Sequence, residues 1–128
     1  MRRMAGTMLG AVVVLTLAGC SGGGGGTTGP ATCSPTGPKL TIVAKDFQFD
    51  KDCLAAKADT PFTIEFDNQD AGTPHNVAIV DDQGTKVFTG EIFSGSQTET
   101  YHPTPLKAGT YDFHCDVHPT MEGTFIVE

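Results

Sequence analysis

The hydrophobic positions from residue 40 onward fall in short runs that alternate with polar positions. These runs are rich in β-branched and aromatic residues, and Gly, Pro, Asn and Asp separate them, which is typical of strands joined by turns. No helical periodicity continues over about ten residues. The chain is therefore predicted to be all-β. The predicted strands are Leu40–Ala44, Phe47–Phe49, Phe62–Phe66, Asn76–Val80, Val87–Phe88 with a continuation to Phe93, Thr98–Tyr101, Thr110–Cys115 and Thr124–Val127.

Two segments between the predicted strands contain residues that predict a local structure. Asp82-Gln83-Gly84 predicts a hairpin turn, because Asp and Gly favour the backbone conformations of tight turns. Ala55–Asp59 favours one helical turn, which Pro61 would limit because proline lacks the backbone donor that a helix needs. Any helix is therefore expected to be confined to that one turn.

Side chains alternate between the two faces of a strand, and this places two polar residues on inward faces. His75 shares its face with Val77 and Ile79, and Cys115 shares its face with Phe113. A single inward His or Cys is more often an ordinary core residue than a metal ligand. Two of them at strand ends, with further ligand-type residues nearby, indicate a site at one end of a sandwich.

Cys115, His118 and Met121 are spaced three residues apart, and with His75 they supply one thiolate, two imidazoles and one thioether. A Cys and two His with a weak axial Met are typical of electron-transfer copper sites. Zinc also binds Cys and His, but structural zinc sites favour several thiolates or imidazoles and do not use a thioether. Met121 therefore favours copper, and we expect one copper ion per chain.

The first residues of the chain resemble an export signal. Within residues 1–19, Arg2 and Arg3 precede an apolar run, which is shorter than the about 20 residues needed to span a bilayer. Leu17-Ala18-Gly19-Cys20 looks like the lipobox of bacterial lipoproteins, where cleavage leaves a lipidated Cys20. We therefore expect an exported chain, lipid-anchored to a bacterial membrane and facing the periplasm or the cell exterior.

Residues 20–38 are predicted to be a flexible linker, because five consecutive glycines and Thr, Pro and Ser leave few apolar side chains for a core. Residues 39–128 are then one domain by length. If Cys20 carries lipid and Cys115 carries metal, Cys33 and Cys53 remain, and exported proteins keep disulfides. We expect a bridge between them. Two separate thiols stay an alternative, since the sequence does not give their separation.

The charge of the chain excludes one class of partner. Removing Arg2 and Arg3 with residues 1–19 leaves six lysines against fifteen acidic residues, a formal charge of −9. Such an acidic chain is not expected to bind nucleic acid. An acidic surface attracts basic partner proteins, although its more common role is to keep a protein soluble.

Several segments of the chain resemble the cupredoxin family of small blue copper proteins. They are Pro74–Val77, Gly109–Tyr111, Cys115–Met121 and Gly123–Val127. The resemblance covers residues 39–128, and the Cys-x-x-His-x-x-Met spacing is the short form seen in amicyanin and pseudoazurin. It implies a Greek-key β-sandwich of seven or eight strands with one type 1 copper. By the same resemblance, His75, Cys115 and His118 would be equatorial ligands and Met121 the weak axial ligand.

Two residues beside the ligands also match family positions. The amide of Asn76 is expected to brace the cysteine loop, because hydrogen bonds to ligands and their neighbours tune metal sites. Pro119 is expected to stiffen the loop after His118 and to remove a donor there. An apolar rim around the exposed edge of His118, where electrons enter or leave in related proteins, is expected from Pro74, Pro119, Met121 and Leu106.

The resemblance, together with the expected lipid anchor at Cys20, leads us to expect a membrane-tethered, monomeric single-electron carrier between redox proteins, and not an enzyme. The alternative is copper storage, delivery or tolerance without an electron-transfer partner, but the predicted burial of His75 and Cys115 favours the carrier. A second, catalytic copper would need further histidines beside His114, and only His102 is unassigned. His114 and His102 are therefore expected to lie on the surface.

Overall fold

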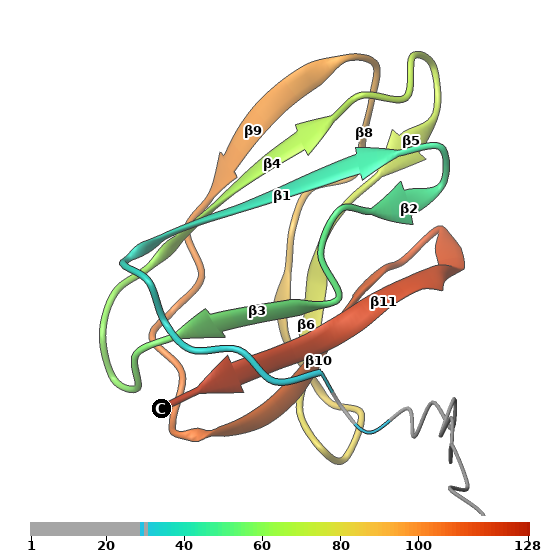
Figure 1. The fold of residues 1–128 in the computed structure, drawn as a ribbon. Coiled ribbons are helices and arrows are strands. Elements are labelled where there is room, and N and C mark those ends of the chain that lie inside the picture. The colour runs from blue at the N-terminus through green and yellow to red at the C-terminus, as the bar shows by residue number, and fades with distance from the viewer. Residues whose placement is uncertain (1–28, 30) are drawn as a thin grey trace, which may run out of the picture.

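The computed structural model describes residue 29 and residues 31–128, and this part of the chain is built from strands. Figure 1 shows two layers of strands that face each other, the arrangement of a β-sandwich. The described residues form eleven strands, of which eight have three or more residues. The all-β prediction is confirmed, and the seven or eight strands expected from the family correspond to these eight longer ones.

The predicted signal segment and Cys20 lie outside the described residues, so export and lipid attachment stay predictions. The end of the predicted linker is described, and residues 31–38 contain no strand. Within the part of the chain that the structure describes, no helix is long and apolar enough to cross a membrane.

The first sheet has four strands in the order β2, β1, β4 and β9. β1 and β4 are parallel, with Leu40 opposite Ile64, and the other pairs are antiparallel. Parallel neighbours need a crossover connection, and here the chain passes through β3 in the other sheet. The bounds of these strands are β1 Lys39–Lys45, β2 Gln48–Phe49, β4 Thr63–Asn68 and β9 Gln97–Tyr101.

The second sheet has five strands in the order β3, β11, β10, β6 and β7, and β5 and β8 form a separate pair. β3 is parallel to β11, whereas the other pairs are antiparallel. The bounds are β3 Cys53–Ala56, β5 Pro74–His75, β6 Ala78–Val80, β7 Lys86–Thr89, β8 Phe93–Ser94, β10 Gly109–Cys115 and β11 His118–Val127. The C-terminal strand therefore lies between β3 and β10 and joins the early and late parts of the chain.

The predicted helical turn at Ala55–Asp59 is wrong. Ala55 and Ala56 belong to β3, where Leu54 is opposite Phe125 of β11. Leu54 and both alanines are buried in this strand, so pairing and burial outweigh the helix propensity of alanine. The predicted strand Asn76–Val80 is shorter in the structure, where β6 begins at Ala78.

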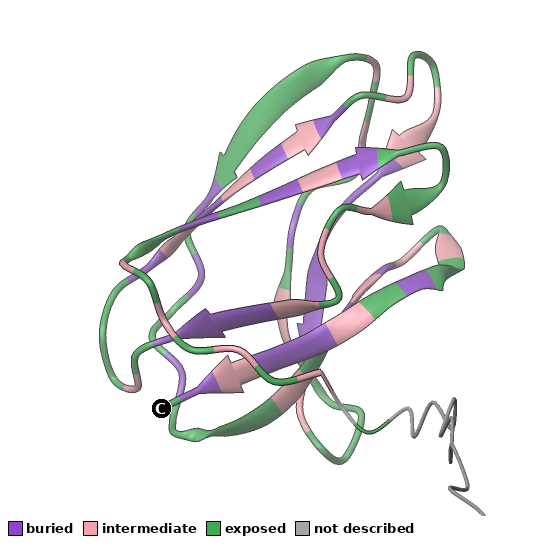
Figure 2. Cartoon of the chain, in the orientation of Figure 1, coloured by how far each residue is buried: buried purple, intermediate pink, exposed green. Residues whose placement is uncertain are grey.

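Both sheets contain buried residues, which are the purple bands in Figure 2, and these residues form one hydrophobic core. β4 alternates buried and partly exposed positions, and its Ile64 and Phe66 have no exposed surface. The ring centroid of Phe49 on β2 lies 6.4 Å from that of Phe66 and 5.5 Å from that of Phe113 on β10. These aromatic contacts connect the two sheets near the end where β2 lies.

The predicted hairpin turn joins β6 to β7. The N–H of Gly84 donates to the carbonyl of Asp81, and the Asp81 carboxylate accepts from the N–H groups of Gln83 and Thr85. Gly84 has a φ of 79°, which favours glycine because it lacks a Cβ. The turn prediction is confirmed.

A disulfide joins Cys33 to Cys53, with their Cα atoms 6.1 Å apart. It connects the segment before β1 to the first residue of β3. Among the described residues Cys115 is the free cysteine, and it is buried. The structure therefore pairs the two cysteines that were expected to bridge and leaves Cys115 available to a metal.

Gly123 of β11 is a sensitive packing position. A Cβ at this residue would lie 2.3 Å from the ring of Phe113 and 2.7 Å from the carbonyl oxygen of Asp52. Gly123→Ala should lower the free energy of unfolding by about 1–3 kcal/mol, because overpacking displaces neighbouring atoms. Urea denaturation measures this change. Gly109→Ala is the control, since its Cβ would lie 3.5 Å from Tyr111, and equal stability of the two variants would contradict the prediction.

Candidate metal centre

Three of the four predicted ligands converge at one end of the sandwich. His75 Nδ1 lies 3.8 Å from Cys115 Sγ and 3.0 Å from His118 Nδ1, and Cys115 Sγ lies 3.7 Å from His118 Nδ1. The point equidistant from these three atoms is about 2.0 Å from each, which fits the roughly 2.0–2.3 Å at which imidazole nitrogen and thiolate sulfur bind zinc. The triangle therefore has the size needed to hold one transition-metal ion.

Each of these side chains comes from a different strand. His75 ends β5, Cys115 ends β10 and His118 begins β11. β10 and β11 are joined by two residues only, and Cys115 is opposite His118 in the ladder. His118 lies between the predicted strands Thr110–Cys115 and Thr124–Val127, but the structure places it in a strand, because the turn after Cys115 has only two residues.

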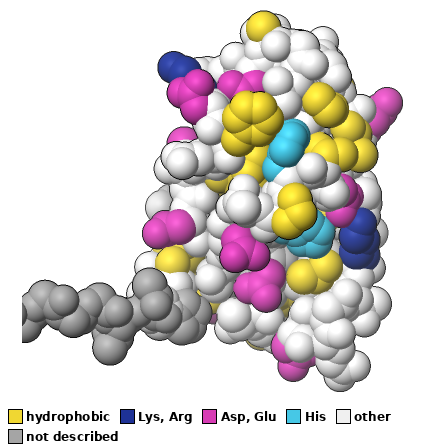
Figure 3. Space-filling view, turned by 90° about the vertical axis from the view of Figure 1, so that its right-hand side faces the viewer, with side chains coloured by type: hydrophobic (Ala, Val, Ile, Leu, Met, Phe, Trp, Pro, Cys, Tyr) yellow, Lys and Arg dark blue, Asp and Glu magenta, His cyan; other side chains and the backbone are white. Residues whose placement is uncertain are grey.

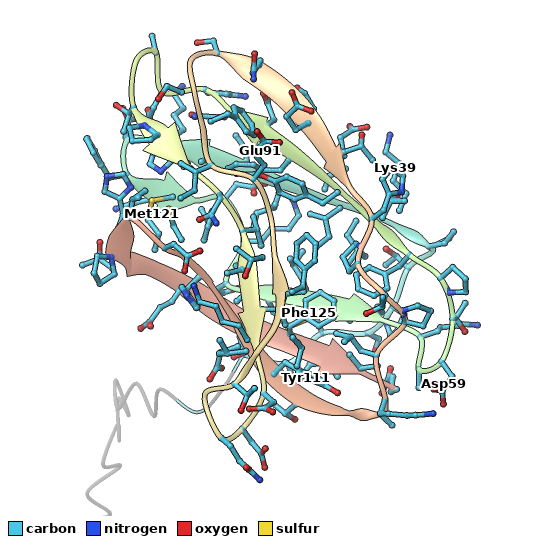
Figure 4. The ribbon with its side chains drawn as sticks, turned by 180° about the vertical axis from the view of Figure 1, so that it is seen from behind. Lys39, Asp59, Glu91, Tyr111, Met121 and Phe125 are labelled. Carbon is cyan, nitrogen blue, oxygen red and sulfur yellow. A yellow bond between two sulfur atoms is a disulfide. The ribbon has the colours of Figure 1, made fainter. Side chains whose placement is uncertain are left out.

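Met121 lies within an irregular stretch of the ladder between β10 and β11. His114 is opposite Glu122 although Cys115 is opposite His118, so three residues of β11 between these pairs, including Met121, have no partner in β10. Met121 is nevertheless buried, with 1% of its surface exposed. Figure 4 shows its sulfur inside the end of the molecule where β11 begins. The side chain is therefore inward at the end that holds the other three ligands.

An acidic residue that the sequence analysis did not single out orients His75. Asp70 Oδ2 lies 2.9 Å from His75 Nε2, and the Asp70 side chain is 13% exposed. A ligand histidine commonly donates its second ring N–H to a carboxylate, which fixes the tautomer and the ring orientation. With Nε2 as the donor, His75 Nδ1 is left with a lone pair that points at His118 and Cys115.

The tautomer of His75 bears on whether this site can hold a metal ion. His75 Nδ1 and His118 Nδ1 are 3.0 Å apart next to a buried thiol. Two nitrogen lone pairs that face each other repel unless a proton or a cation lies between them. A soft cation satisfies both nitrogens and the sulfur at once, so the donor set fits copper by its chemistry as well as by its size.

Asp70 also binds the backbone of the turn between β1 and β2. Its Oδ1 accepts from the N–H of Asp46 at 2.8 Å, and its Oδ2 accepts from the N–H of Phe47 at 3.1 Å. Partial burial raises the pKa of Asp70, but these two bonds and the contact with His75 lower it by more, so the pKa lies below its ordinary value. The carboxylate is therefore held in its charged form.

An exposed aromatic residue borders the site. The ring centroid of Phe47 lies 5.1 Å from that of His118 and 6.0 Å from that of His75, in edge-to-face orientation. Phe47 is 53% exposed. Figure 3 shows apolar side chains gathered around a histidine on this face of the molecule.

The expected apolar rim is partly wrong. Leu106 is buried and its carbonyl accepts from the N–H of Asp59. Figure 4 shows Asp59 and Met121 at opposite ends of the molecule, so Leu106 is far from His118. Met121 is also buried, so it is not part of an exposed rim either. Phe47 lies beside His118 instead, and no local pattern of the sequence indicated this.

Asn76 connects the segment of His75 to the turn after Cys115. Its Nδ2 donates to Asp116 Oδ2 at 2.9 Å and to the carbonyl of Gly90 at 3.0 Å, and its Oδ1 accepts from the N–H of Asp116 at 2.9 Å. Asn76 has no exposed surface. The amide therefore occupies the bracing position that the family resemblance implied for it.

The Asp116 carboxylate is shared between several groups. It also binds the ammonium group of Lys86 on β7 and lies 3.2 Å from His114 Nε2. Burial raises the pKa of Asp116, but the hydrogen bonds from Lys86, Asn76 and His114 lower it by more, so the pKa is below its ordinary value. The turn after Cys115 is thus tied to two neighbouring strands.

The remaining histidines do not join the site. The side chain of His114 is 28% exposed and turns to Asp116, and His102 is exposed. Within residue 29 and residues 31–128, His75, Cys115 and His118 form the one group of three or more His, Cys, Asp or Glu side chains arranged to hold a metal. Pro119 is exposed and follows His118 in β11.

Comparison with known sequences agrees with this geometry. A family model described as a cupredoxin-like domain matches residues 10–127. The amicyanin of Paracoccus denitrificans is 39% identical over 67 residues, which are 52% of this chain and 49% of the amicyanin. The amicyanin of Paracoccus versutus is 43% identical over 56 residues, which are 43% of this chain and 41% of that protein. The chain spans about half the length of the curated relatives it matches.

Comparison with solved structures gives the same fold. Auracyanin A, a "blue" copper protein from Chloroflexus aurantiacus, has a TM-score of 0.63 at 23% identity, covering 78% of this chain and 100% of that chain. The crystal structure of amicyanin from Paracoccus versutus has a TM-score of 0.54 at 30% identity, covering 70% of this chain and 80% of that chain. The sandwich is therefore shared with small bacterial proteins of these two kinds.

Removal of the Asn76 amide should loosen the turn after Cys115. Asn76→Ala leaves the N–H of Asp116 and the carbonyl of Gly90 without their partner, which should cost about 1–3 kcal/mol of unfolding free energy. Urea unfolding of the metal-free chain measures it. Thr98→Ala is the control, because its hydroxyl bond to Asp67 is exposed and should matter by less than about 0.5 kcal/mol. Equal stabilities of the two variants would show that the brace has no energetic role.

Proposed function

This chain belongs to the cupredoxin-like domain family, and on that premise we propose that it is a type 1 copper protein that carries single electrons between redox proteins. His75, Cys115 and His118 would be the three strong ligands and Met121 the weak fourth one. The bound ion would supply the one-electron couple between Cu(I) and Cu(II). The observation that carries the proposal is the triangle of two imidazole nitrogens and one thiol sulfur, sized for one ion, in which His75 and Cys115 are buried.

Restraints on the ligands support an electron carrier. Electron transfer is fast when a site rearranges little between its two oxidation states, so ligands that are already fixed by the protein favour it. Asp70 fixes the ring of His75, and Asn76 fixes the backbone of the turn that separates Cys115 from His118. Each restraint acts through the protein and is present without the metal.

The partial exposure of one ligand supports a carrier. A carrier needs only an exposed edge near one ligand, and His118 is partly exposed.

We further propose that the protein works as a monomer at the outer side of a bacterial membrane, held by lipid on Cys20 between a donor and an acceptor protein. The Leu17–Cys20 segment supports the anchor. The disulfide between Cys33 and Cys53 supports an exported location, because disulfides are rare where thiols are kept reduced.

The alternative function is storage or delivery of copper without an electron-transfer partner. A delivery site has to release its metal, which favours exposed ligands. His75 and Cys115 are 0% and 1% exposed, and Met121 is 1% exposed. This burial favours the carrier.

The optical spectrum of the copper-loaded chain tests the proposed site. Loading with Cu(II) should give one copper per chain and an intense blue thiolate-to-copper band, which Cys115→Ser should abolish because it removes the sulfur. His114→Gln is the matched control, since its side chain points away from the ligands, and it should keep the band. A colourless wild-type protein, or an unchanged band in Cys115→Ser, would refute the type 1 site, and a second copper per chain would reopen an enzymatic function.

Competition with a copper chelator separates the carrier from the delivery protein. A carrier with three buried ligands should release copper slowly in both oxidation states, because the ligand cluster must open before the metal leaves. The measurement is the rate of copper transfer to excess chelator before and after reduction. Rapid transfer from both Cu(I) and Cu(II) would favour delivery.

A further inference from the structure

The turn between β1 and β2 has an uncommon backbone conformation. Asp46 and Phe47 have φ values of 52° and 60°, and Lys45 and Gln48 pair on either side of them. Two-residue hairpin turns with positive φ at both central positions usually contain Asn and Gly, because a Cβ is unfavourable there. A phenylalanine in this conformation has to be held in place by neighbouring groups.

Asp70 holds this turn and a ligand with the same carboxylate. It accepts the N–H groups of Asp46 and Phe47 at 2.8 and 3.1 Å and contacts His75 Nε2 at 2.9 Å. Hydrogen bonds to a charged group are stronger than those between neutral groups. These bonds offset the unfavourable backbone conformation and hold the backbone from which the Phe47 side chain extends.

Phe47 points at the ligand that is reached from solvent. Its ring contacts His118 in edge-to-face geometry, with the centroids 5.1 Å apart, while about half of its surface stays exposed. His75 has no exposed surface, whereas His118 is partly exposed. His118 therefore has space on its outer side, and Phe47 occupies part of that space.

We propose that Asp70 is a positioning residue for both histidines of the site. It orients His75 directly, and it orients His118 through Phe47, which the carboxylate fixes against the outer side of the His118 ring. The turn between β1 and β2 thereby borders the metal site and limits the motion of its ligands. This inference rests on the proposed function, since it concerns the ligands of that site.

The effect of Asp70 on His118 through Phe47 can be measured separately from its direct effect on His75. Phe47→Ala removes the ring, which is closer to His118 than to His75, and leaves the contact between Asp70 and His75, so His118 gains more freedom than His75. Asp70→Asn weakens the hold on the turn and the contact with His75, so both rings gain freedom. If Asp70 acts on His118 through Phe47, the effect of Asp70→Asn on His118 disappears once Phe47 is alanine.

The experiment measures the motion of each histidine ring by NMR relaxation in the metal-free full chain with labelled imidazole carbons. The wild type should show two ordered rings. In Phe47→Ala the order parameter of His118 should fall toward the values of flexible groups, below about 0.6, and that of His75 should fall by less, because Asp70 still holds its ring. Asp70→Asn should lower both, and the double variant should match Phe47→Ala for His118.

A second readout uses the loaded protein. The rate at which a chelator extracts Cu(I) should rise by about three- to tenfold in Phe47→Ala, the factor expected from loss of one aromatic pair. Phe47→Leu, which keeps an apolar side chain without the ring, should fall between Phe47→Ala and the wild type. These two variants decide the role of Phe47 even where Asp70→Asn does not fold.

Matched controls remove similar groups elsewhere. Ile92→Ala truncates another exposed apolar side chain, 46% exposed, and Asp67→Asn removes one negative charge from a residue that binds Gln69 and Thr98. Both should leave the His118 ring and the extraction rate as in the wild type.

Two results would overturn the inference. One is a His118 ring that is as ordered in Phe47→Ala as in the wild type. The other is an equal effect of Asp70→Asn on His118 with and without Phe47. Neither result depends on the colour of the protein. A wild-type chain that binds copper without a blue band refutes the proposed function. Ring motion in the metal-free chain tests the role of Asp70 separately.

Discussion

The site depends first on the close pairing of β10 with β11 across a two-residue turn. This connection places Cys115 opposite His118 and brings the thiol within 3.7 Å of the imidazole before any other part of the protein contributes. In a hairpin of regular register Met121 would be opposite Asp112. The shift of register instead releases Met121 from the ladder, and its side chain is buried at the same end of the molecule.

The other half of the site is supplied by a segment about 40 residues earlier, and polar contacts determine where it lies. His75 sits on a two-residue strand, which alone is too short to fix a side chain. Asp70 and Asn76 compensate, because each connects this segment to another part of the chain. The carboxylate of Asp70 and the amide of Asn76 both have hydrogen-bond partners, so these two groups do not carry the cost of unpaired burial.

Local pattern predicted most of the framework and the chemistry of the site. Period-two alternation gave the strands and turned His75 and Cys115 inward, and both are buried. The spacing of Cys115, His118 and Met121 identified the donor atoms. The local pattern failed at Ala55–Asp59. The alanines there have helical propensity but form β3, because β11, some 70 residues later, pairs with this strand. Such long-range pairing leaves no trace in a local window.

Asp70 and Phe47 show the limit of local information most clearly. Their contacts join residues 23 and 24 positions apart. Asp70 belongs to no motif or periodic face, and Phe47 was predicted to begin the strand Phe47–Phe49, whereas it lies in the turn before β2. An acidic residue five positions before His75 and an aromatic residue in a turn are both ordinary in sequence. The identity of the donor atoms is a property of residue type and spacing, which the chain carries locally. The orientation of the donor atoms, and the neighbouring groups that fix it, arise only when the β1–β2 turn packs against the end of the second sheet. That contact exists only in the folded sandwich.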